Sequence, residues 1–481
     1  MSIISQENII KVLTAFNPWW KSGGIRPEFS KTYKRFAFYE TMKILTHKTI
    51  RRTIVLTGAR RVGKTTIQYQ IIEDLLKSGV EPKKIVFVSL DHPLFKLCKL
   101  NEILDCYHAN IYGDEDCHYF LDEVQYAADW DLWVKTIYDM RPLSRMVATG
   151  SASPVLKKKA AESGAGRWTI VQVPTLSFYE YCEMLDLERP KLPPQLKPTN
   201  LIRFGKRELT LLVNQLSGLQ KHFNRYLAVG GFPELALSKD DYMAQSVMRE
   251  DVVDKVLKRD IPSLYNVRNS TELERIFLYL CYHSSNIIAV DAIARELEGV
   301  ARATVDDYIA YMESANLIYR SFPVGMNGKK ILKAKAKIYI ADAAIRNAVL
   351  MDDNLLLDPE QLGITVETAV YKHIAAFYYQ NTTSVGYYRD KKKDNEIDIV
   401  VEYPRGKILI EVKYRENARI GEKDAIYELA DEAAFSIVVT KRSEDYGIQN
   451  SKGVNKILRL PAFAFLYLLG NAEKHGYRGA R

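Results

Sequence analysis

A glycine-rich run that ends in lysine and threonine is the segment whose residue types and spacing most clearly indicate chemistry. It reads Gly58-Ala59-Arg60-Arg61-Val62-Gly63-Lys64-Thr65 and fits the pattern G-x-x-x-x-G-K-[ST] in full. Glycines let successive backbone N–H groups curl around a phosphate, and the N-terminal end of a following helix adds partial positive charge. Lys64 would reach the β- and γ-phosphates, and the Thr65 hydroxyl would bind Mg²⁺. We therefore expect the run, extended to Thr66, to bind ATP–Mg²⁺.

Two carboxylates, Asp122 and Glu123, follow the apolar run Tyr119-Phe120-Leu121. A buried strand would carry them to the carboxyl edge of a parallel sheet, where such sheets bind ligands. We expect Asp122 to hold Mg²⁺, directly or through water, and Glu123 to polarise the attacking water. A further apolar strand ends near Thr149 and Ser151, which would sense the γ-phosphate or position that water. A polar turn without a ligand is the alternative for this last segment.

The elements that must position these residues follow from the alternation of strand-like and helical segments. Strand-like runs at 53–57, 84–90, 118–121, 144–149 and 169–173 are separated by helical patterns, which predicts an α/β fold with a parallel, RecA- or AAA-like sheet. Five regions are expected: an N-terminal helical segment (1–50), the ATPase domain (51–187), a proline-rich linker with a helical, lid-like region (188–271), a winged-helix-like domain (272–336) and a C-terminal α/β domain (337–481).

The order of short motifs along the chain resembles that of the AAA-type ATPases of the AAA_14 group, whose C-terminal half is a domain of the DUF4143 type. The resemblance covers most of the chain, although Val173-Pro174-Thr175 matches only approximately. It rests on the glycine-rich run and on Phe120-Leu121-Asp122-Glu123-Val124-Gln125, Thr149-Gly150-Ser151, Gly166-Arg167, Leu176-Ser177-Phe178-Tyr179-Glu180-Tyr181, Gly230-Gly231-Phe232-Pro233-Glu234, Asp260-Ile261-Pro262 and Lys337-Ile338-Tyr339-Ile340-Ala341-Asp342.

The resemblance implies a role for one arginine outside the glycine-rich run. An arginine follows the sensor strand in the family, and Arg167 stands at that place. It would stabilise charge on the transferred phosphate in cis or from a neighbouring subunit of a homo-oligomer. Arg60 and Arg61 are alternatives, and a solvated surface position is the other reading of Arg167.

Residues 272–336 show apolar spacing typical of three helices followed by a strand hairpin, the layout of a winged helix. The exposed face of the third helix carries Asp306, Asp307 and Glu313, whereas a helix that reads DNA presents Arg, Lys, Asn or Gln. A packing module is therefore the alternative to a DNA reader. Basic residues gather just after this helix, where they would contact phosphates or form a solvated turn: Lys329, Lys330, Lys333, Lys335 and Lys337.

Carboxylates also recur in the C-terminal region. Glu367 lies in the predicted helix 364–379, Asp398 in strand 396–401, and Glu411 with Lys413 in strand 407–413. Alternation places Glu411 and Lys413 on one face of their strand and Ile408, Ile410 and Val412 on the other. Asp followed by Glu-x-Lys on the next strand is the arrangement of the PD-(D/E)xK nuclease fold. We expect Glu367, Asp398 and Glu411 to bind Mg²⁺, with Asp398, Glu411 and Lys413 catalytic; an inactive nucleic-acid binder is the alternative.

Composition limits the partners. The formal charge of +9 on 481 residues fits a DNA partner or a mildly basic solvated surface, and five scattered cysteines fit a reducing cytoplasm. The sequence shows no membrane-spanning run and no signal-peptide pattern, so a cytoplasmic location is expected. Two functions follow: an ATPase coupled to a DNA-binding or DNA-cleaving domain, or a nucleotide-driven switch that recruits a protein partner, which the 30 tyrosines would suit.

Overall fold

The computed structural model describes residues 4–114, 116–151, 166–194, 196–325, 334–351, 357–378, 384–390, 395–404 and 406–478. The chain divides into two compact units. Unit 1 contains Met1–Pro174 and Ser314–Asn316, and unit 2 contains Thr175–Glu313 and Leu317–Arg481. Three of the lysines in the predicted basic run, Lys329, Lys330 and Lys333, lie outside the described residues.

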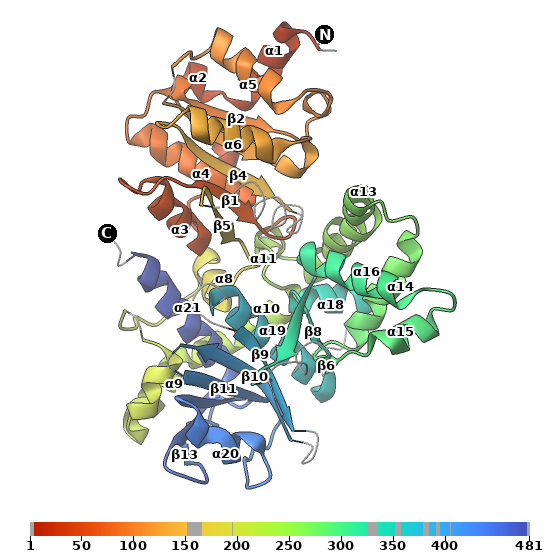
Figure 1. The fold of residues 1–481 in the computed structure, drawn as a ribbon. Helices are drawn as coiled ribbons and strands as arrows, with labels where there is room; N and C mark the ends of the chain where they lie inside the picture. The colour runs from red at the N-terminus through yellow and green to blue at the C-terminus, as the bar shows by residue number, and fades with distance from the viewer. Residues whose placement is uncertain are drawn as a thin grey trace. The chain divides into compact units, whose positions relative to one another are not determined.

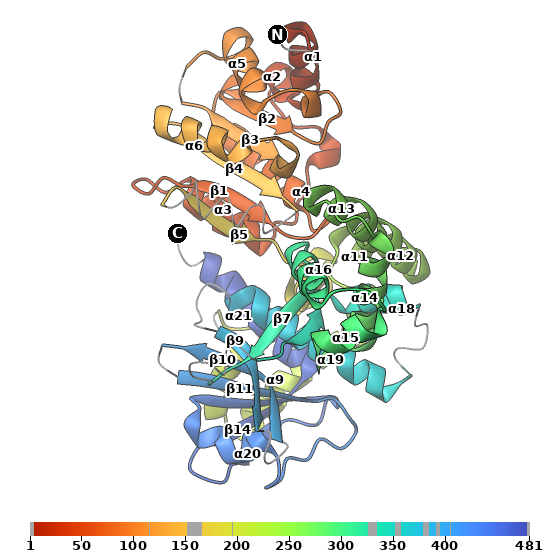
Figure 2. The same ribbon diagram turned by 45° about the vertical axis from the view of Figure 1, so that its right-hand side comes forward.

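Unit 1 is built on a five-stranded parallel sheet with the strand order β2-β3-β4-β1-β5 (Figures 1 and 2). This arrangement confirms the predicted α/β fold with a parallel sheet. Strand β1 lies between β4 and β5, so the loop that follows it leaves from an inner strand at the carboxyl edge. The strands are β1 (Thr53–Thr57), β2 (Ile85–Ser89), β3 (His118–Asp122), β4 (Arg145–Gly150) and β5 (Trp168–Gln172).

Helices cover both faces of this sheet. Val55, Val86 and Ala148 pack in one core with side chains from α1, α5 and α6. On the other face α3 and α4 pack against each other and contact β1, β4 and β5. Every residue of β1 and β2 is buried, and burial on both faces explains why the residues between the polar strand ends are apolar. The helices are α1 (Gln6–Phe16), α2 (Trp19–Ser22), α3 (Phe36–Leu45), α4 (Lys64–Lys77), α5 (Leu100–Asn110) and α6 (Trp130–Met140).

The segment Asn17-Pro18-Trp19-Trp20 lies along β2, which is the edge strand of the sheet. The Asn17 side chain donates to the Phe87 carbonyl at 2.8 Å and accepts from the Phe87 N–H at 2.6 Å. The indole N–H groups of Trp19 and Trp20 both donate to the Ile85 carbonyl. These side chains satisfy backbone groups that an exposed edge strand would otherwise offer to another chain.

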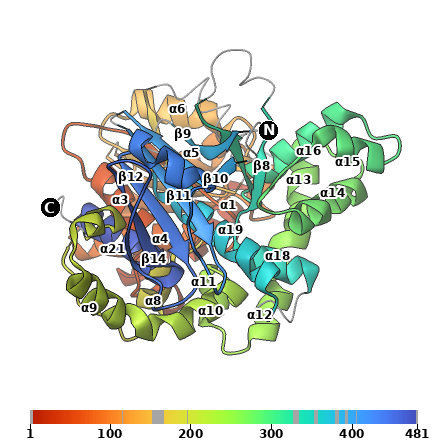
Figure 3. The ribbon, with the colours of Figure 1, turned by 90° about the horizontal axis from the view of Figure 1, so that it is seen from below.

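Unit 2 contains a nine-stranded mixed sheet in the order β13-β14-β12-β11-β10-β9-β7-β8-β6, with β11, β12 and β14 side by side in Figure 3. Helices α19 and α21 lie on one side of the C-terminal strands and α20 lies on the other (Figures 1 and 2). The strands are β6 (Asn286–Ile287), β7 (Ile318–Pro323), β8 (Lys337–Ile340), β9 (Ser384–Asp390), β10 (Asn395–Tyr403), β11 (Gly406–Lys413), β12 (Phe435–Thr440), β13 (Gly447–Asn450) and β14 (Lys456–Pro461).

The first part of unit 2 is helical, as the apolar spacing predicts. A π-helical stretch, Met248–Asp254 and Val256–Asp260, lies between α12 and α13. The helices of the unit are α8 (Phe178–Met184), α9 (Lys206–Leu216), α10 (Gln220–Val229), α11 (Pro233–Leu237), α12 (Asp241–Val247), α13 (Ile261–Tyr265), α14 (Ser270–Tyr282), α15 (Val290–Glu296), α16 (Arg302–Ser314), α18 (Ala343–Leu350), α19 (Pro359–Tyr378), α20 (Ala425–Leu429) and α21 (Ala462–Arg478).

Helices α14, α15 and α16 are followed by the antiparallel pair β7 and β8. Strand β7 also pairs in parallel with β9, so the sheet continues from this segment into the C-terminal strands. Asp306 and Asp307 are exposed on α16, and the Glu313 carboxylate accepts from Arg320 Nε at 2.7 Å. The exposed face of α16 therefore carries negative charge, as expected from the sequence.

Candidate functional site

The glycine-rich run forms a loop between β1 and the N-terminus of α4, which begins at Lys64. Arg61 and Gly63 have positive φ angles of 60° and 95°, so the chain turns through left-handed conformations before the helix starts. Lys64 is 5% exposed, and its ammonium donates to the Gly58 carbonyl at 2.9 Å and the Ala59 carbonyl at 2.8 Å. Phosphate oxygens can replace these two acceptors, because the three N–H donors of the ammonium group can rotate toward new acceptors.

Asp122 ends β3 next to this loop. Its carboxylate accepts from the Thr65 hydroxyl at 3.0 Å and from the Thr149 hydroxyl at 2.6 Å. Burial and repulsion from Glu123 raise the pKa of Asp122 to about 7. A carboxylate beside a threonine hydroxyl supplies the hard oxygen ligands that Mg²⁺ prefers, so Thr65 and Asp122 fit the predicted metal position.

Glu123 has a left-handed backbone with φ 55°, a conformation that costs a non-glycine residue of the order of 1 kcal/mol. Its N–H donates to the Thr149 hydroxyl at 3.0 Å. Its carboxylate accepts from the Ser151 hydroxyl at 3.4 Å and, more closely, from the Gln125 amide. Thr149 thus contacts the Asp122 carboxylate and the Glu123 backbone N–H, and Ser151 contacts the Glu123 carboxylate, at the carboxyl ends of β3 and β4.

Gln125 also belongs to the site, although the sequence indicated no separate role for it within the motif Phe120-Leu121-Asp122-Glu123-Val124-Gln125. Its amide nitrogen contacts the Glu123 carboxylate and donates to Ser151 Oγ at 3.0 Å. The signal in the sequence was its place two residues after Glu123, in the turn that follows β3. This contact fixes the direction of the Glu123 side chain.

The structure does not bring Arg167 to this edge of the sheet. Arg167 directly precedes β5, and Trp168 pairs with Thr53 at the start of β1, whereas the glycine-rich loop follows the end of β1. The Arg167 guanidinium donates to Asp139 at 2.9 Å. At about 3.3 Å per residue, the length of β1 separates Arg167 from the loop within one chain. A role in cis does not fit this position, and a role toward a neighbouring subunit stays a prediction; Arg60 and Arg61 lie within the loop itself.

The C-terminal carboxylates gather around a buried lysine that the sequence analysis had assigned to a basic run. The Lys337 side chain is 3% exposed, and its ammonium lies 2.8 Å from Glu367, 2.8 Å from Glu396 and 3.4 Å from Asp398. The hydroxyl of Tyr339, two residues along β8, donates to Glu367 at 2.8 Å. Lys337 and Tyr339 belonged to a quoted motif, but nothing in their spacing indicated that they would reach Glu367.

Asp398 and Glu411 lie on neighbouring strands. Asp398 falls where the pairing of β10 with β9 shifts register, between Ile397 and Val400, and its carboxylate accepts from the Val412 N–H at 2.8 Å. A register shift re-aims a side chain out of the regular alternation. Glu411 contacts Lys413 at 3.0 Å, and Lys413 also contacts Asp424, at 2.9 Å.

The expected division of β11 into an apolar face and a face for Glu411 and Lys413 is only partly right. Ile410 is buried, but Leu409, which alternation places with Glu411, is also buried and packs in a core with Ile426 of α20. Glu411 itself is 8% exposed. The reason is that helices contact both sides of this central strand, so Leu409, Ile410 and Glu411 are all buried.

The centre holds more carboxylates than ammonium groups. Burial and repulsion from Asp398 raise the pKa of Glu367 to about 7 and that of Glu411 to about 8. One carboxylate oxygen of Glu411, Oε2, is buried without a hydrogen-bond partner among the described residues. This oxygen is free to bind a cation, so a divalent cation held by Asp398 and Glu411 fits the site.

Glu367, Asp398 and Glu411 were predicted to bind one metal ion together. Over the described ranges, no three or more His, Cys, Asp or Glu side chains are arranged as a metal-binding group. Glu367 is directed at Lys337 and Tyr339, as the distances above show. The structure therefore brings Glu367, Asp398 and Glu411 into one centre, but not as three ligands around one point.

Three family models match the chain in succession. An AAA domain (AAA_14) matches residues 50–182, a domain of unknown function (DUF8612) matches residues 220–356, and a second one (DUF4143) matches residues 362–463. The chain therefore carries an AAA domain of the AAA_14 family followed by a DUF4143 domain, which confirms the resemblance found in the sequence. Lys337 belongs to the DUF8612 segment, whereas Glu367, Asp398 and Glu411 belong to the DUF4143 segment.

Two uncharacterised proteins match much of the chain. An uncharacterised protein of Methanocaldococcus jannaschii is 24% identical over 399 residues, which is 81% of this chain and 81% of that protein. An uncharacterised protein of Haemophilus influenzae is 21% identical over 61% of this chain and 68% of its own.

Among solved structures, the Aeropyrum pernix Orc1 protein in complex with DNA aligns with a TM-score of 0.30 at 12% identity, over 70% of this chain and 97% of that one. AMPPCP-bound DnaA from Aquifex aeolicus aligns with a TM-score of 0.25 at 16% identity, over 60% of this chain and 92% of that one.

Within the part of the chain that is described, no helix has both the length and the apolar character that a membrane span needs.

Proposed function

We propose that this chain, with its AAA and DUF4143 domains, hydrolyses ATP in unit 1 and uses the nucleotide cycle to control a DNA-binding, nuclease-like unit 2. The observation that carries the first half is the convergence of Lys64, Thr65, Asp122, Glu123 and Thr149 at the carboxyl ends of the neighbouring strands β1, β3 and β4. Few functions other than triphosphate chemistry need a helix N-terminus, a lysine and two carboxylates at one edge.

Each side chain has a defined task in this proposal. Lys64 turns from the Gly58 and Ala59 carbonyls to the β- and γ-phosphates of ATP. Thr65 and Asp122 hold Mg²⁺, which when bound neutralises phosphate charge. Glu123 accepts a proton from the attacking water, while Gln125 and Ser151 keep its carboxylate in place. The arginine that stabilises transferred charge is Arg60, Arg61 or, in a homo-oligomer, Arg167 of a neighbouring subunit.

The test of hydrolysis is Glu123→Gln in the full-length chain. We expect ATP binding to be retained and turnover to fall by about 10²–10⁴-fold, because the variant lacks the general base. Phosphate release measures turnover, and a fluorescent nucleotide measures binding. Hydrolysis at the parental rate would contradict the assignment of Glu123.

The second half of the proposal rests on how the chain leaves the nucleotide loop. Val173 N–H donates to the Thr57 carbonyl at 2.7 Å, and a Cβ on Gly58 would lie 2.2 Å from the Val173 carbonyl oxygen. The Arg35 guanidinium donates to the Val62 carbonyl at 2.9 Å and to the Pro174 carbonyl at 2.7 Å. The exit segment Val173–Pro174 is therefore held directly against the loop that would bind ATP.

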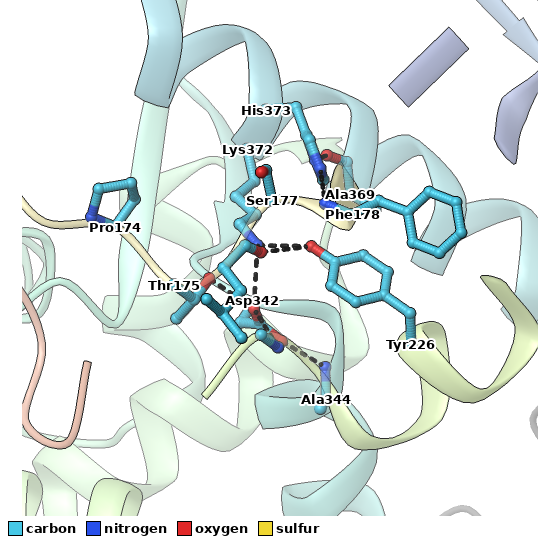
Figure 4. A network of polar contacts seen from close by, with 12 residues as sticks. Pro174, Thr175, Ser177, Phe178, Tyr226, Asp342, Ala344, Ala369, Lys372 and His373 are labelled. Carbon is cyan, nitrogen blue, oxygen red and sulfur yellow. Dashed lines mark hydrogen bonds and ion pairs between the residues drawn. The ribbon is translucent and has the colours of Figure 1, made fainter. Parts of the chain in front are cut away.

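Thr175, the first residue of unit 2, enters a buried polar network (Figure 4). Its hydroxyl donates to Asp342 at 2.6 Å, and the Lys372 ammonium lies 3.3 Å from the same carboxylate. Lys372 also donates to the Tyr226 hydroxyl and to the Leu176 carbonyl, each at 2.7 Å. Because Pro174 and Thr175 are bonded to each other, a shift of the ATP loop would reach this network through two residues.

Glycines make this network possible. A Cβ on Gly230 would lie 2.3 Å from an Asp342 carboxylate oxygen, and one on Gly231 would lie 2.5 Å from the Leu176 carbonyl oxygen. The motif Gly230-Gly231-Phe232-Pro233 and the motif that ends in Asp342, both noted in the sequence, thus meet at the start of unit 2. Their close packing gives the exit segment a rigid attachment in unit 2.

Hydrogen exchange of the Glu123→Gln protein with and without ATP tests the coupling. We expect ATP to change exchange at residues 175–178 and 226–231, and Arg35→Met in the same background to remove most of that change while ATP still binds. Lys34→Met is the matched control, since Lys34 pairs with Asp74 on the surface of α4. An unchanged response in Arg35→Met and in Thr175→Val would rule out this route.

For unit 2 the proposal assigns Asp398 and Glu411 to a divalent cation and Lys413 to the water that attacks a phosphodiester. Support comes from Glu411 Oε2, which has no hydrogen-bond partner within the ranges that the structure describes, and from the net charge of +9. Nicking or degradation of DNA in Mg²⁺ or Mn²⁺, lost in Lys413→Ala, is the expected result. If no DNA is cut and Lys413→Ala behaves as the parent does, the nuclease part of the proposal fails.

The second candidate is a nucleotide-driven switch that recruits a protein partner through unit 2. The negative charge that α16 exposes at Asp306 and Asp307 favours it, because that face would repel DNA. A salt titration separates the two candidates. Affinity for DNA that falls steeply with salt supports the first, and the absence of DNA binding at low salt supports the second.

A further inference from the structure

The carboxylate centre of unit 2 contains a cation that belongs to the chain itself. Lys337 approaches Glu367 of α19 and Glu396 of β10 at 2.8 Å each, and Asp398 of β10 at 3.4 Å. With 3% of its side chain exposed, the ammonium has no access to a substrate in solvent. Three carboxylates from two elements surround this one buried ammonium. A metal ion in its place would be surrounded by carboxylate oxygens in the same way.

Glu367 already has two partners on the side of the centre that faces β8. One of its oxygens, Oε1, receives both the Lys337 ammonium and the Tyr339 hydroxyl, each at 2.8 Å. Lys337 and Tyr339 are two positions apart on β8, so strand alternation directs both side chains toward the same side. A divalent cation on the same Glu367 oxygen would lie beside the Lys337 ammonium, and the low dielectric of the interior would strengthen the repulsion between the two charges.

The opposite side of the centre is different. Glu411 Oε2 is buried and has no hydrogen-bond partner in the described part of the chain, and Lys413 contacts the other oxygen of Glu411, at 3.0 Å. Asp398 lies between the two sides: one of its oxygens faces Lys337, and the other accepts from the Val412 N–H. The centre is therefore closed to an external cation at Glu367 and open to one at Glu411.

We propose that Lys337 is a built-in cation that takes the place of a divalent metal ion among Glu367, Glu396 and Asp398, so that Glu367 is a lysine-holding residue and not a metal ligand. The proposal concerns residues of this chain only and stands whether or not unit 2 cuts DNA or answers to ATP. It makes the site a composite of two segments, since β8 supplies the cation and α19 and β10 supply the carboxylates.

The test replaces the ammonium by an apolar group in the full-length, nucleotide-free protein. Removing one partner of a buried charge cluster is strongly destabilising, so Lys337→Met should lower the melting temperature by about 10 °C. Millimolar Mn²⁺ should restore most of that loss, and calorimetry should find one more Mn²⁺ bound per chain than in the parent. Lys335→Met, two residues earlier and exposed, should show neither effect.

Two results would overturn the proposal: parental stability of Lys337→Met without metal, or a loss of stability that Mn²⁺ does not restore. Glu367→Gln provides a measurement that does not depend on the folding of Lys337→Met, because it leaves Lys337 paired with Glu396 and Asp398. The number of Mn²⁺ ions bound and their affinity should equal those of the parent. A tenfold loss of Mn²⁺ affinity in Glu367→Gln would show that Glu367 is a metal ligand after all.

Discussion

The two units hold their lysines in opposite ways. Lys64 of unit 1 donates to two backbone carbonyls, which are neutral and which a phosphate can replace. Lys337 and Lys372 of unit 2 lie against buried carboxylates and supply the positive charge beside them. A lysine on carbonyls can change partners at little cost, whereas a lysine on buried carboxylates is part of the folded structure. Burial alone therefore does not identify a site; the partner does.

The largest expected effect of this difference is on the stability of unit 2. Lys372→Met should lower the free energy of unfolding by about 3–5 kcal/mol, because it leaves the Asp342 carboxylate buried without its cation. Chemical denaturation of the full-length chain measures the loss. Lys258→Met, which removes an exposed pair with Asp254, should change stability by less than about 1 kcal/mol. Equal effects of the two variants would mean that the buried pair contributes no more than a surface pair.

Lys64→Ala should weaken nucleotide binding and leave stability nearly unchanged. Nucleotide affinity should fall by at least about 100-fold, close to 3 kcal/mol, because the charge that meets the phosphates is lost. The free energy of unfolding should change little, since the two carbonyls can turn to water. Fluorescent nucleotide binding and denaturation on the same preparation give both numbers. A destabilisation as large as that of Lys372→Met would contradict the comparison.

A smaller effect is expected at the side chain that directs Glu123. Gln125→Ala should lower kcat by about tenfold with little change in the KM for ATP, because it removes a group that positions the base and does not bind nucleotide. Ser151→Ala should act in the same direction, and the double variant should cost less than the sum of the two. A rise in KM with an unchanged kcat would place Gln125 in binding instead.

A further effect concerns pH and the buried network around Lys372. His373 is fully buried, its Nε2 accepts from the Phe178 N–H at 2.9 Å, and burial together with Lys372 holds its pKa well below 6.5 (Figure 4). The unfolded chain therefore binds a proton that the folded chain does not, and stability is lost as pH falls below about 6.5, by up to about 1.4 kcal/mol per pH unit.

Denaturation between pH 7 and pH 5 measures this dependence. His373→Gln should flatten it, because the amide oxygen can still accept from Phe178 and carries no titrating group. His283→Gln, at an exposed position of unit 2, is the control and should leave the slope unchanged. The same slope in parent and His373→Gln would assign the pH dependence to other groups.

The sequence by itself determined the parts whose chemistry is contiguous. The glycine-rich run sets its own backbone path, and β-branched strands with Asp122 or Thr149 at their ends predict a parallel sheet and the edge at which these side chains meet. Alternation and helical spacing also placed Glu367, Asp398, Glu411 and Lys413 on the correct elements. These features depend on local residue order, which is what a sequence records directly.

Only the tertiary structure decided which distant residues meet. It placed Arg167 at the far edge of the sheet from the nucleotide loop, because parallel strands fix which ends lie together. It moved Lys337 from a supposed basic surface into the carboxylate centre, through pairings 30 to 61 residues away along the chain. It joined Thr175, Gly231 and Asp342 in one network. Such contacts depend on packing of whole elements, and no periodicity in the sequence carries that information.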